Sequence, residues 1–284
     1  MLPFSRFFIL FILFSLASPL VTAANTSRDK PAPRIISLAP HITELVYAAG
    51  GGESLVGVSA YSDYPEMAQN LTIVGDAFRI DLEQLLLLDA DAVIYWHGNT
   101  SLTVMQQLEK HGFKLIPVEI NNLSDIAISL RKIAEYLSLP EPESAKLLEA
   151  KLNKLKQTIR PSQRAFIQLS EQPIYTVSGT HWMSEAASLC GLSNIFPTLA
   201  TTAATVSKEA VIVANPQVII RTQELTDHSP LLQWPQIDAI KYNRIVTLNP
   251  NTFSRPTPRI TQAIDDLCRQ VDQFSGDFIE LESN

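Results

Sequence analysis

The 284-residue sequence has few glycines, only two cysteines and no excess of positive charge. With 10 glycines and 46% hydrophobic residues, the composition is typical of a packed globular protein and argues against a disordered one. Lys and Arg together number 22 against 29 Asp and Glu, which gives a net charge of −7. Nucleic-acid binding requires clustered cations, so we do not expect a nucleic acid as partner.

Common catalytic and metal-binding motifs are also absent. The glycine-rich stretch GGGES, residues 50–54, has neither the phosphate-loop nor the dinucleotide-binding pattern, and Gly50 is expected to end a helix. HExxH and GxSxG do not occur. Cys190 and Cys268 lack the nearby Cys or His residues of a zinc site. We therefore expect no enzymatic activity, no resident metal ion and no cofactor.

The first 24 residues are expected to be a signal peptide. Arg6 precedes an apolar run over residues 7–16, and small residues follow up to Ala24. The alternative is a membrane anchor, but the run is shorter than the roughly 20 residues of a membrane span, and no later segment qualifies. Cleavage near Ala24 would change the net charge from −7 to −8 and place the mature chain outside the cytoplasm. Export favours a disulfide between Cys190 and Cys268, which are 78 positions apart.

Short apolar strands alternate with helical patterns along the rest of the chain, which predicts parallel sheets covered by helices. In the first half the expected strands are RIISLA, SLVGVSA, AVIYW and KLIPVE, and the expected helices are HITELVYAAG, LEQLLLLD and TVMQQLEKHG. The alternation restarts after Pro161 with AFIQLS, PIYTVSG, HWMSEAASLCG, VIVAN, QVIIRT and RIVTLN. Between the halves, ESAKLLEAKLNKLKQTIR predicts a long helix with Leu148, Leu152, Leu155 and Ile159 on one stripe.

The two halves resemble each other, which predicts two similar α/β lobes. Asp81 and Glu83 precede DADAVIYW, while Ser207 and Glu209 take the equivalent places in SKEAVIVANPQVIIRT. We expect a flexible segment at 25–33, a first lobe at 34–140, a rigid connecting helix at 141–161, a second lobe at 162–276 and a tail at 277–284.

Ligands in open α/β sheets bind beyond the carboxyl ends of the strands, so the residues there should line a cleft between the lobes. Aromatic and polar residues occupy these places: Tyr61, Tyr64, Phe78, Tyr95, Trp96, His97, Tyr175, His181, Trp182, Asn251, Phe253, Ser254 and Arg255. Any one of them could instead be a packing residue. Together they predict a site for a large, flat, mostly neutral ligand with polar fringes.

Several of these stretches resemble the periplasmic cobalamin-binding proteins of ABC importers. The similarity is carried by RIISLAPHITELVYAAG, GVSAYSDYPE, VGDAFRIDLEQLL, SEAASLCGLSNIF, TVSKEAVIVANPQVII and SRPTPR, and extends from about Arg34 to Gln273. It implies two Rossmann-like lobes joined by one long helix, and a monomer that carries cobalamin to a permease with its ATPase.

The resemblance also implies roles for individual residues. Tyr61, Trp96 and the stretch from Phe253 to Arg255 match its ligand-contacting positions, and Cys190 and Cys268 match its disulfide pair. The sequence departs from the family where Ala77 and Ala203 replace tryptophans, where Ser254 replaces an acidic residue, and where His41 replaces a small one. His41 is expected at the rim of the site, with cobalt ligation as the alternative.

Glu83 and Glu209 match glutamates that, in the family, bind arginines of the permease. The alternative is that each only stabilises the first turn of a helix whose N-cap is Asp81 or Ser207. Three other functions stay open for the whole chain: binding of haem, binding of a ferric siderophore, and an interaction protein without a small ligand. Haem would need an axial ligand such as Tyr61 or His41, and an anionic siderophore would need cleft arginines, for which Arg79, Arg221 and Arg255 are the candidates.

Overall fold

The computed structural model describes residues 32–76, 79–222 and 230–281, with side chains described up to residue 274. The predicted signal peptide, most of the 25–33 segment, Ala77 and Phe78 lie outside these residues. Ala32–Asn284 group into one compact unit. Within the described residues, no helix combines the length and the apolarity that a bilayer span requires.

The first lobe is built on a five-stranded sheet in which every pairing is parallel, with the order β3-β2-β1-β4-β5. Its strands are β1 (Ile35–Ser37), β2 (Leu55–Val58), β3 (Thr72–Ile73), β4 (Ala92–Trp96) and β5 (Lys114–Val118). Its helices are α1 (Pro40–Ala48), α2 (Leu82–Leu87), α3 (Leu102–Lys110) and α4 (Ser124–Tyr136), with short 3₁₀ helices η1 (Gly52–Ser54) and η2 (Glu66–Asn70).

Alternate residues of β4 enter two different hydrophobic clusters, because successive side chains of a strand point to opposite faces. Ile94 packs with Leu45 of α1 and Leu130 of α4. Val93 and Tyr95 pack in a second cluster that contains Leu85 of α2 and Leu108 of α3. Helices therefore cover both faces of the sheet, as the strand and helix alternation predicted.

The second lobe repeats this plan with a four-stranded parallel sheet in the order β12-β11-β6-β9. Its strands are β6 (Gln163–Gln168), β9 (Leu192–Asn194), β11 (Val218–Arg221) and β12 (Ile245–Thr247). A separate antiparallel sheet, which was not predicted, contains β7 (Ser170–Glu171), β8 (Ile174–Val177) and β10 (Ala203–Thr205). The helices are α6 (Trp182–Ser188), α7 (Lys208–Ala214), α8 (Asp238–Lys241), α9 (Pro250–Phe253), α10 (Ile260–Leu281) and the 3₁₀ helix η3 (Pro230–Gln233).

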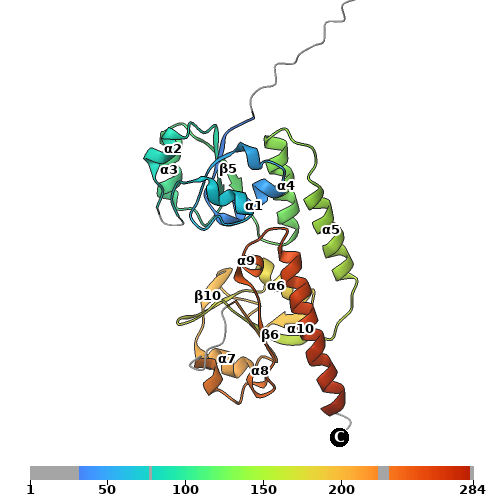
Figure 1. The fold of residues 1–284 in the computed structure, drawn as a ribbon. Helices are drawn as coiled ribbons and strands as arrows, with labels where there is room; N and C mark the ends of the chain where they lie inside the picture. The colour runs from blue at the N-terminus through green and yellow to red at the C-terminus, as the bar shows by residue number, and fades with distance from the viewer. Residues whose placement is uncertain (1–31, 77–78, 223–229, 282–284) are drawn as a thin grey trace, which may run out of the picture. The chain divides into compact units, whose positions relative to one another are not determined.

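Helix α5 (Glu143–Lys156) separates the two sheets in the chain and runs beside α4 (Figure 1). Leu148, Leu152 and Leu155 are buried on one stripe, as predicted. The prediction for Ile159 was wrong, because the helix ends at Lys156 and Ile159 is 97% exposed. Pro161 follows closely, and helices usually end before the residue that precedes a proline.

Helix α10 is attached to its surroundings by covalent and ionic bonds. Cys268 forms the predicted disulfide with Cys190, at the C-terminal end of α6. Asp265 of α10 forms a salt bridge with Lys151 of α5, with 2.6 Å between Lys151 Nζ and Asp265 Oδ1. α10 is therefore tied both to α6 of the second lobe and to α5.

Candidate functional site

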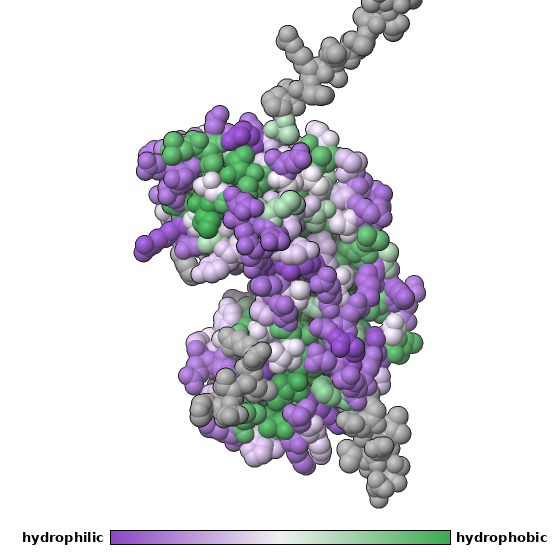
Figure 2. All heavy atoms as spheres, viewed as in Figure 1, coloured by the Kyte–Doolittle hydropathy of each residue, from purple (hydrophilic) through white to green (hydrophobic). Residues whose placement is uncertain are grey.

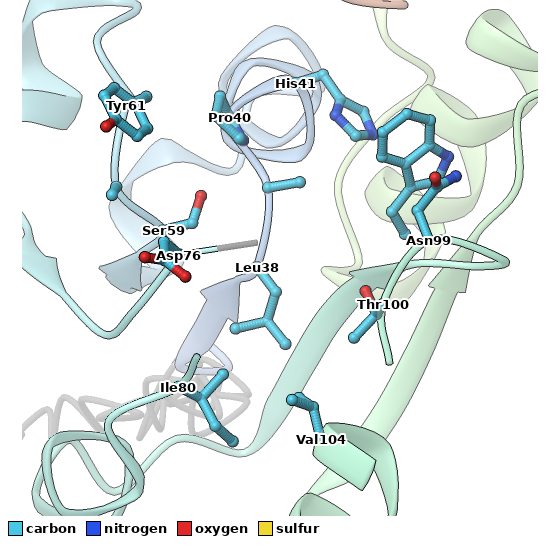
Figure 3. A pocket seen from close by; sticks show the side chains of 13 residues that line it. Leu38, Pro40, His41, Ser59, Tyr61, Asp76, Ile80, Asn99, Thr100 and Val104 are labelled. Carbon is cyan, nitrogen blue, oxygen red and sulfur yellow. The ribbon is translucent and has the colours of Figure 1, made fainter. Parts of the chain in front are cut away.

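A cavity of about 530 Å³ lies at the carboxyl ends of β1, β2 and β4 in the first lobe, and we call it the inner cavity. It is lined by Leu38, Ala39, Pro40, His41, Ser59, Ala60, Tyr61, Asp76, Ile80, Trp96, Asn99, Thr100 and Val104. Figure 3 shows Tyr61 and His41 on opposite sides of Pro40. The position agrees with the rule that parallel sheets bind ligands beyond the carboxyl ends of their strands.

A second cavity, of about 420 Å³, brings residues of both lobes together, and we call it the outer cavity. The first lobe contributes Trp96, His97, Gly98, Asn99, Glu119, Ile120 and Asn121, and the second contributes Tyr175, Thr180, His181, Trp182, Thr202 and Ala203. Trp96 and Asn99 line both cavities. The space-filling view shows the surface hollowed between the two lobes (Figure 2).

His41 and Trp96 form the aromatic wall of the inner cavity. The two ring centroids are 4.5 Å apart at an interplanar angle of 73°, which is an edge-to-face contact. His41 is only 4% exposed, and its Nε2 is buried without a hydrogen-bond partner among the described residues. Burial, aided by the charge of Arg255, lowers the pKa of His41 to about 3. The imidazole is therefore neutral at physiological pH.

Hydrogen bonds within the first lobe and from Arg255 of the second lobe hold the loop that carries Tyr61. Its side chain is 80% exposed and its backbone is left-handed, with φ of 65°. The next residue, Ser62, is buried, and its Oγ lies 2.9 Å from the Oγ1 of the buried Thr43. The carbonyl oxygen of Tyr61 accepts a hydrogen bond of 3.2 Å from Arg255 Nη2. These contacts present the ring at the mouth of the inner cavity.

Arg255 belongs to an ion cluster that joins the lobes, made of Glu44, Asp63, Arg255 and Arg259, which we call the Glu44 cluster. Glu44 on α1 is 3% exposed. Its Oε1 accepts from Arg255 Nη1 at 2.9 Å, and its two oxygens accept from Arg259 at 2.5 and 2.9 Å. Arg255 Nη1 also donates to Asp63 at 2.5 Å. Burial alone would raise the pKa of Asp63, but the hydrogen bond and charge of Arg255 outweigh it and lower that pKa.

The second lobe lines the outer cavity with both aromatic and polar side chains. His181 Nδ1 accepts a hydrogen bond of 3.2 Å from the backbone N–H of Met183 and so caps α6. Because Nδ1 is an acceptor, the ring proton of the neutral form is on Nε2. Burial lowers the pKa of His181 to about 4. Tyr175 is 37% exposed at the same wall, and Ala203 stands where the resemblance places a tryptophan.

The structure brings only part of the predicted site together. Tyr61, Trp96 and His41 line the inner cavity, and Trp96 and Tyr175 line the outer one. Their contact with a ligand stays a prediction. Phe78 lies outside the described residues.

Four residues near the last helix do not line either cavity. Phe253 is fully buried in the main hydrophobic cluster, so its expected ligand contact is corrected to a core role. Tyr95, which is on β4 and is not one of these four, is also buried, with 6% of its surface exposed. Alternation along β4 turns it to the opposite face of the sheet from Trp96. The guanidinium of Arg255 is engaged by Glu44, and Ser254 ends α9. Asn251 accepts from Arg259 through its backbone oxygen.

Small polar residues of the cavities were missed by sequence reasoning. Asn99 and Thr100 follow β4 just beyond Gly98, whose φ of +82° favours glycine. Thr180 and Thr202 line the outer cavity. The strand-end rule could have identified Asn99 and Thr180, but Thr202 belongs to the unpredicted antiparallel sheet region.

Glu83 and Glu209 are exposed in the first turns of α2 and α7. Asp81 caps α2 through a 3.0 Å hydrogen bond to Gln84 N–H, and Ser207 caps α7 through a 3.2 Å bond to Ala210 N–H, so both N-cap predictions are confirmed. Among the described residues neither glutamate forms a salt bridge. Hydrogen bonds from its own backbone and from Ser207 lower the pKa of Glu209.

Within the described part of the chain, no group of three His, Cys, Asp or Glu residues could hold a metal ion.

Comparison with known proteins places this geometry in a family. The model of a family described as periplasmic binding protein matches residues 35–252. A vitamin B12-binding protein of Yersinia pestis is 37% identical over 268 residues, covering 92% of this chain and 94% of the relative. The crystal structure of the periplasmic vitamin B12-binding protein BtuF of Vibrio cholerae is 35% identical with a TM-score of 0.78, covering 85% of this chain and 97% of that one. The periplasmic haem-binding protein RhuT of Roseiflexus, at 23% identity and a TM-score of 0.71, shares the fold; 84% of this chain and 98% of that one are covered.

Proposed function

Because this chain belongs to the periplasmic binding protein family, we propose that it captures cobalamin in the periplasm and delivers it to the permease of an ABC importer. Similarity to vitamin B12-binding relatives covers nearly the whole chain. In this proposal the protein works as a monomer after removal of residues 1–24, with lobes at 34–140 and 162–276. It binds its cargo without chemical change.

The lining of the two cavities is the observation that carries the proposal. Trp96, His41, Tyr61 and Tyr175 provide flat apolar surface, while amide and hydroxyl groups such as those of Asn99 provide hydrogen bonds. Cobalamin is a flat macrocycle fringed by neutral amides, which suits such a lining.

Charge separates cobalamin from the other cargoes. Among the described residues, neither Lys nor Arg lines the inner or the outer cavity, and Asp76 and Glu119 are acidic. Haem carries two carboxylates and many ferric siderophores are anionic, and such groups are normally bound by cations. Arg255, a candidate cation, is already paired with Glu44 and Asp63. The lining therefore favours a neutral corrinoid.

His41 is assigned to the wall of the site. Its Nε2 is buried and the ring packs edge-on against Trp96, so cobalt ligation would require the imidazole to turn out of this contact. Replacement by glutamine keeps polarity without a strong metal donor. We expect the His41→Gln variant to show the same visible spectrum of bound cobalamin as the unmodified protein.

The test of the proposed function is a spectrum after desalting. The protein is incubated separately with cobalamin and with haemin, passed over a desalting column, and its visible absorbance is recorded. We expect one cobalamin per chain to be retained, and haemin to be lost. Retention of haemin without cobalamin would assign the site to haem. Retention of neither would refute the proposal and leave a ferric siderophore or an interaction protein without a small ligand.

Glu83 and Glu209 are proposed to bind cations of the permease. Their equivalent places in the two lobes and their exposure support this role. Replacing both with alanine should weaken binding to the permease while leaving cobalamin affinity unchanged. If each glutamate only stabilises the first turn of its helix, the double variant should lose a little thermal stability and transport cobalamin normally.

A further inference from the structure

An exposed aliphatic residue follows each of these glutamates at the same distance. Leu87 is 71% exposed and Val213 is 85% exposed, and each is four residues after Glu83 or Glu209. Residues four apart lie on the same face of a helix, so each lobe presents a carboxylate beside an aliphatic side chain. In Figure 2 hydrophobic atoms are visible at the surface over α2, where Leu86 is also 48% exposed.

The two helices occupy equivalent places in their lobes. α2 leads into β4, which pairs in parallel with β1, and α7 leads into β11, which pairs in parallel with β6. Each helix begins after a side-chain cap and buries one aliphatic residue, Leu85 or Val211. Four kinds of position therefore recur with the same separation of 126 residues: the cap, the glutamate, the buried aliphatic and the exposed aliphatic.

Burial explains Leu85 and Val211, but not Leu87 and Val213. A single exposed aliphatic residue is ordinary in a soluble protein. Here exposure recurs at the equivalent position of both lobes, and each time beside a carboxylate that forms no salt bridge among the described residues. A surface of this composition fits a partner that presents a cation next to an apolar hollow.

We infer that Leu87 and Val213 are the apolar anchors of two equivalent docking surfaces, Glu83 with Leu87 and Glu209 with Val213, which bind two equivalent sites on the permease. The inference rests on the proposed function. A second copy of this chain is a poorer occupant, because a two-fold contact through either surface would bring glutamate against glutamate. Two like surfaces on one chain suit a partner built from two like subunits.

The test uses the double variant Leu87→Ser with Val213→Ser. The matched control is Leu147→Ser with Ile159→Ser, which removes aliphatic side chains that are 62% and 97% exposed on and just after α5. Binding to the cobalamin permease–ATPase complex of the same host, held in lipid nanodiscs, is measured by interferometry. We expect the double variant to bind at least about 10-fold more weakly and the control to bind within about 2-fold of the unmodified protein.

Cobalamin affinity, measured by calorimetry, separates this inference from the proposed function. If the unmodified protein binds no cobalamin, the proposed function fails. If it binds cobalamin and the permease, and the double variant binds the permease equally well, the apolar anchors are refuted. A dimer of the unmodified protein in analytical ultracentrifugation that is lost in the double variant would assign the surfaces to a second copy and also refute the inference.

A double-mutant cycle gives the sharper result. If Glu83 and Leu87 meet the same site of the partner, the effects of Glu83→Ala and Leu87→Ser on permease binding should be non-additive. Glu83→Ala and Val213→Ser, which belong to different lobes, should be additive. Additivity in both pairs would contradict a shared surface.

Discussion

The two lobes share a fold, but their faces at the cavities differ. Both sheets are parallel, and in each a capped helix leads into the strand that pairs with the first strand of the lobe. In the first lobe that strand, β4, ends at Trp96, which lines both cavities. In the second lobe the equivalent strand, β11, ends at Arg221, which is 2% exposed and paired with Glu171.

This difference shows how one scaffold produces two kinds of wall. In the first lobe the indole at the strand end lines the cavities, whereas in the second lobe the strand end carries the ion pair between Arg221 and Glu171. The second lobe instead contributes Tyr175, Thr180 and Thr202 from β8 and the loops near β10. The first lobe therefore supplies the wall that both cavities share, and the second lobe completes the outer cavity with aromatic and hydrogen-bonding groups.

The largest expected effect concerns the Glu44 cluster, whose ion pairs join the two lobes. Glu44→Ala leaves Arg255 and Arg259 without their buried partner and should lower the free energy of unfolding by about 3–5 kcal/mol. Urea denaturation measures this change. Glu149→Ala is the control, because it removes a bidentate but much more exposed pair with Arg131 and should cost less than about 1 kcal/mol. Equal costs for the two variants would contradict a buried inter-lobe cluster.

The pH dependence of stability compares one histidine from each lobe. His41 and His181 have pKa values of about 3 and about 4 in the fold, below the ordinary 6.5, so the unfolded chain binds more protons in the intervening range. The free energy of unfolding should therefore fall as the pH decreases from about 6.5. Protonation of His181 should lower it by up to about 3 kcal/mol by pH 4, and protonation of His41 should continue to lower it below pH 4.

Urea denaturation between pH 7 and pH 4 measures this loss in the unmodified protein, in His181→Gln and in His41→Gln. Each variant should show a flatter pH profile than the unmodified protein. Identical slopes in all three proteins would mean that other groups cause the loss.

Cobalamin affinity should depend more on the first lobe than on the second. Trp96→Ala removes the wall common to both cavities and should weaken binding about 10- to 150-fold, while Tyr61→Ala and Tyr175→Ala should weaken it about 5- to 10-fold. Calorimetry on folded variants measures these changes. Tyr242→Ala is the control, because Tyr242 is 45% exposed and lines neither cavity. A larger effect of Tyr175→Ala than of Trp96→Ala would reverse the comparison.

The smallest expected effect makes the second lobe more like the first. Ala203→Trp places an indole on the second-lobe wall of the outer cavity and should change cobalamin affinity about 3-fold, with tighter binding if the ring lies flat against the ligand. Ala203→Leu serves as the control, since it adds volume without an aromatic face. If both substitutions change affinity equally, volume alone explains the effect.

Local patterns of the sequence predicted local structure well. The alternation of strand and helix patterns located most strands of both parallel sheets but missed the short edge strands β3 and β9. Asp81 and Ser207 were identified as caps because a cap depends only on residues three positions away. The helix end at Lys156 was missed because the apolar stripe continues to Ile159 although Pro161 follows. The disulfide followed from the expectation of export, and the structure confirms it.

The site was predicted less completely, because it depends on contacts between distant residues. Arg255 was expected to bind ligand, and no pattern near it indicates that Glu44, 211 residues away, pairs with it. Phe253 was expected in the cleft because it is aromatic and near a strand end, but its burial is decided by packing beneath α10. Trp96 and Tyr61 line the inner cavity because they follow strands whose ends form it, and their contact with a ligand stays a prediction.

The disulfide between Cys190 and Cys268 has a mechanical consequence. The two cysteines are 78 positions apart, and the loop that they close contains β9 to β12 and the start of α10. A chain pulled from its two ends cannot extend this loop, so unfolding of the oxidised protein should release about 270 Å less contour length than unfolding of the reduced protein. All of the shortening falls in the second lobe. Under tension the first lobe can extend over its whole length, whereas the second can extend only before Cys190 and after Cys268.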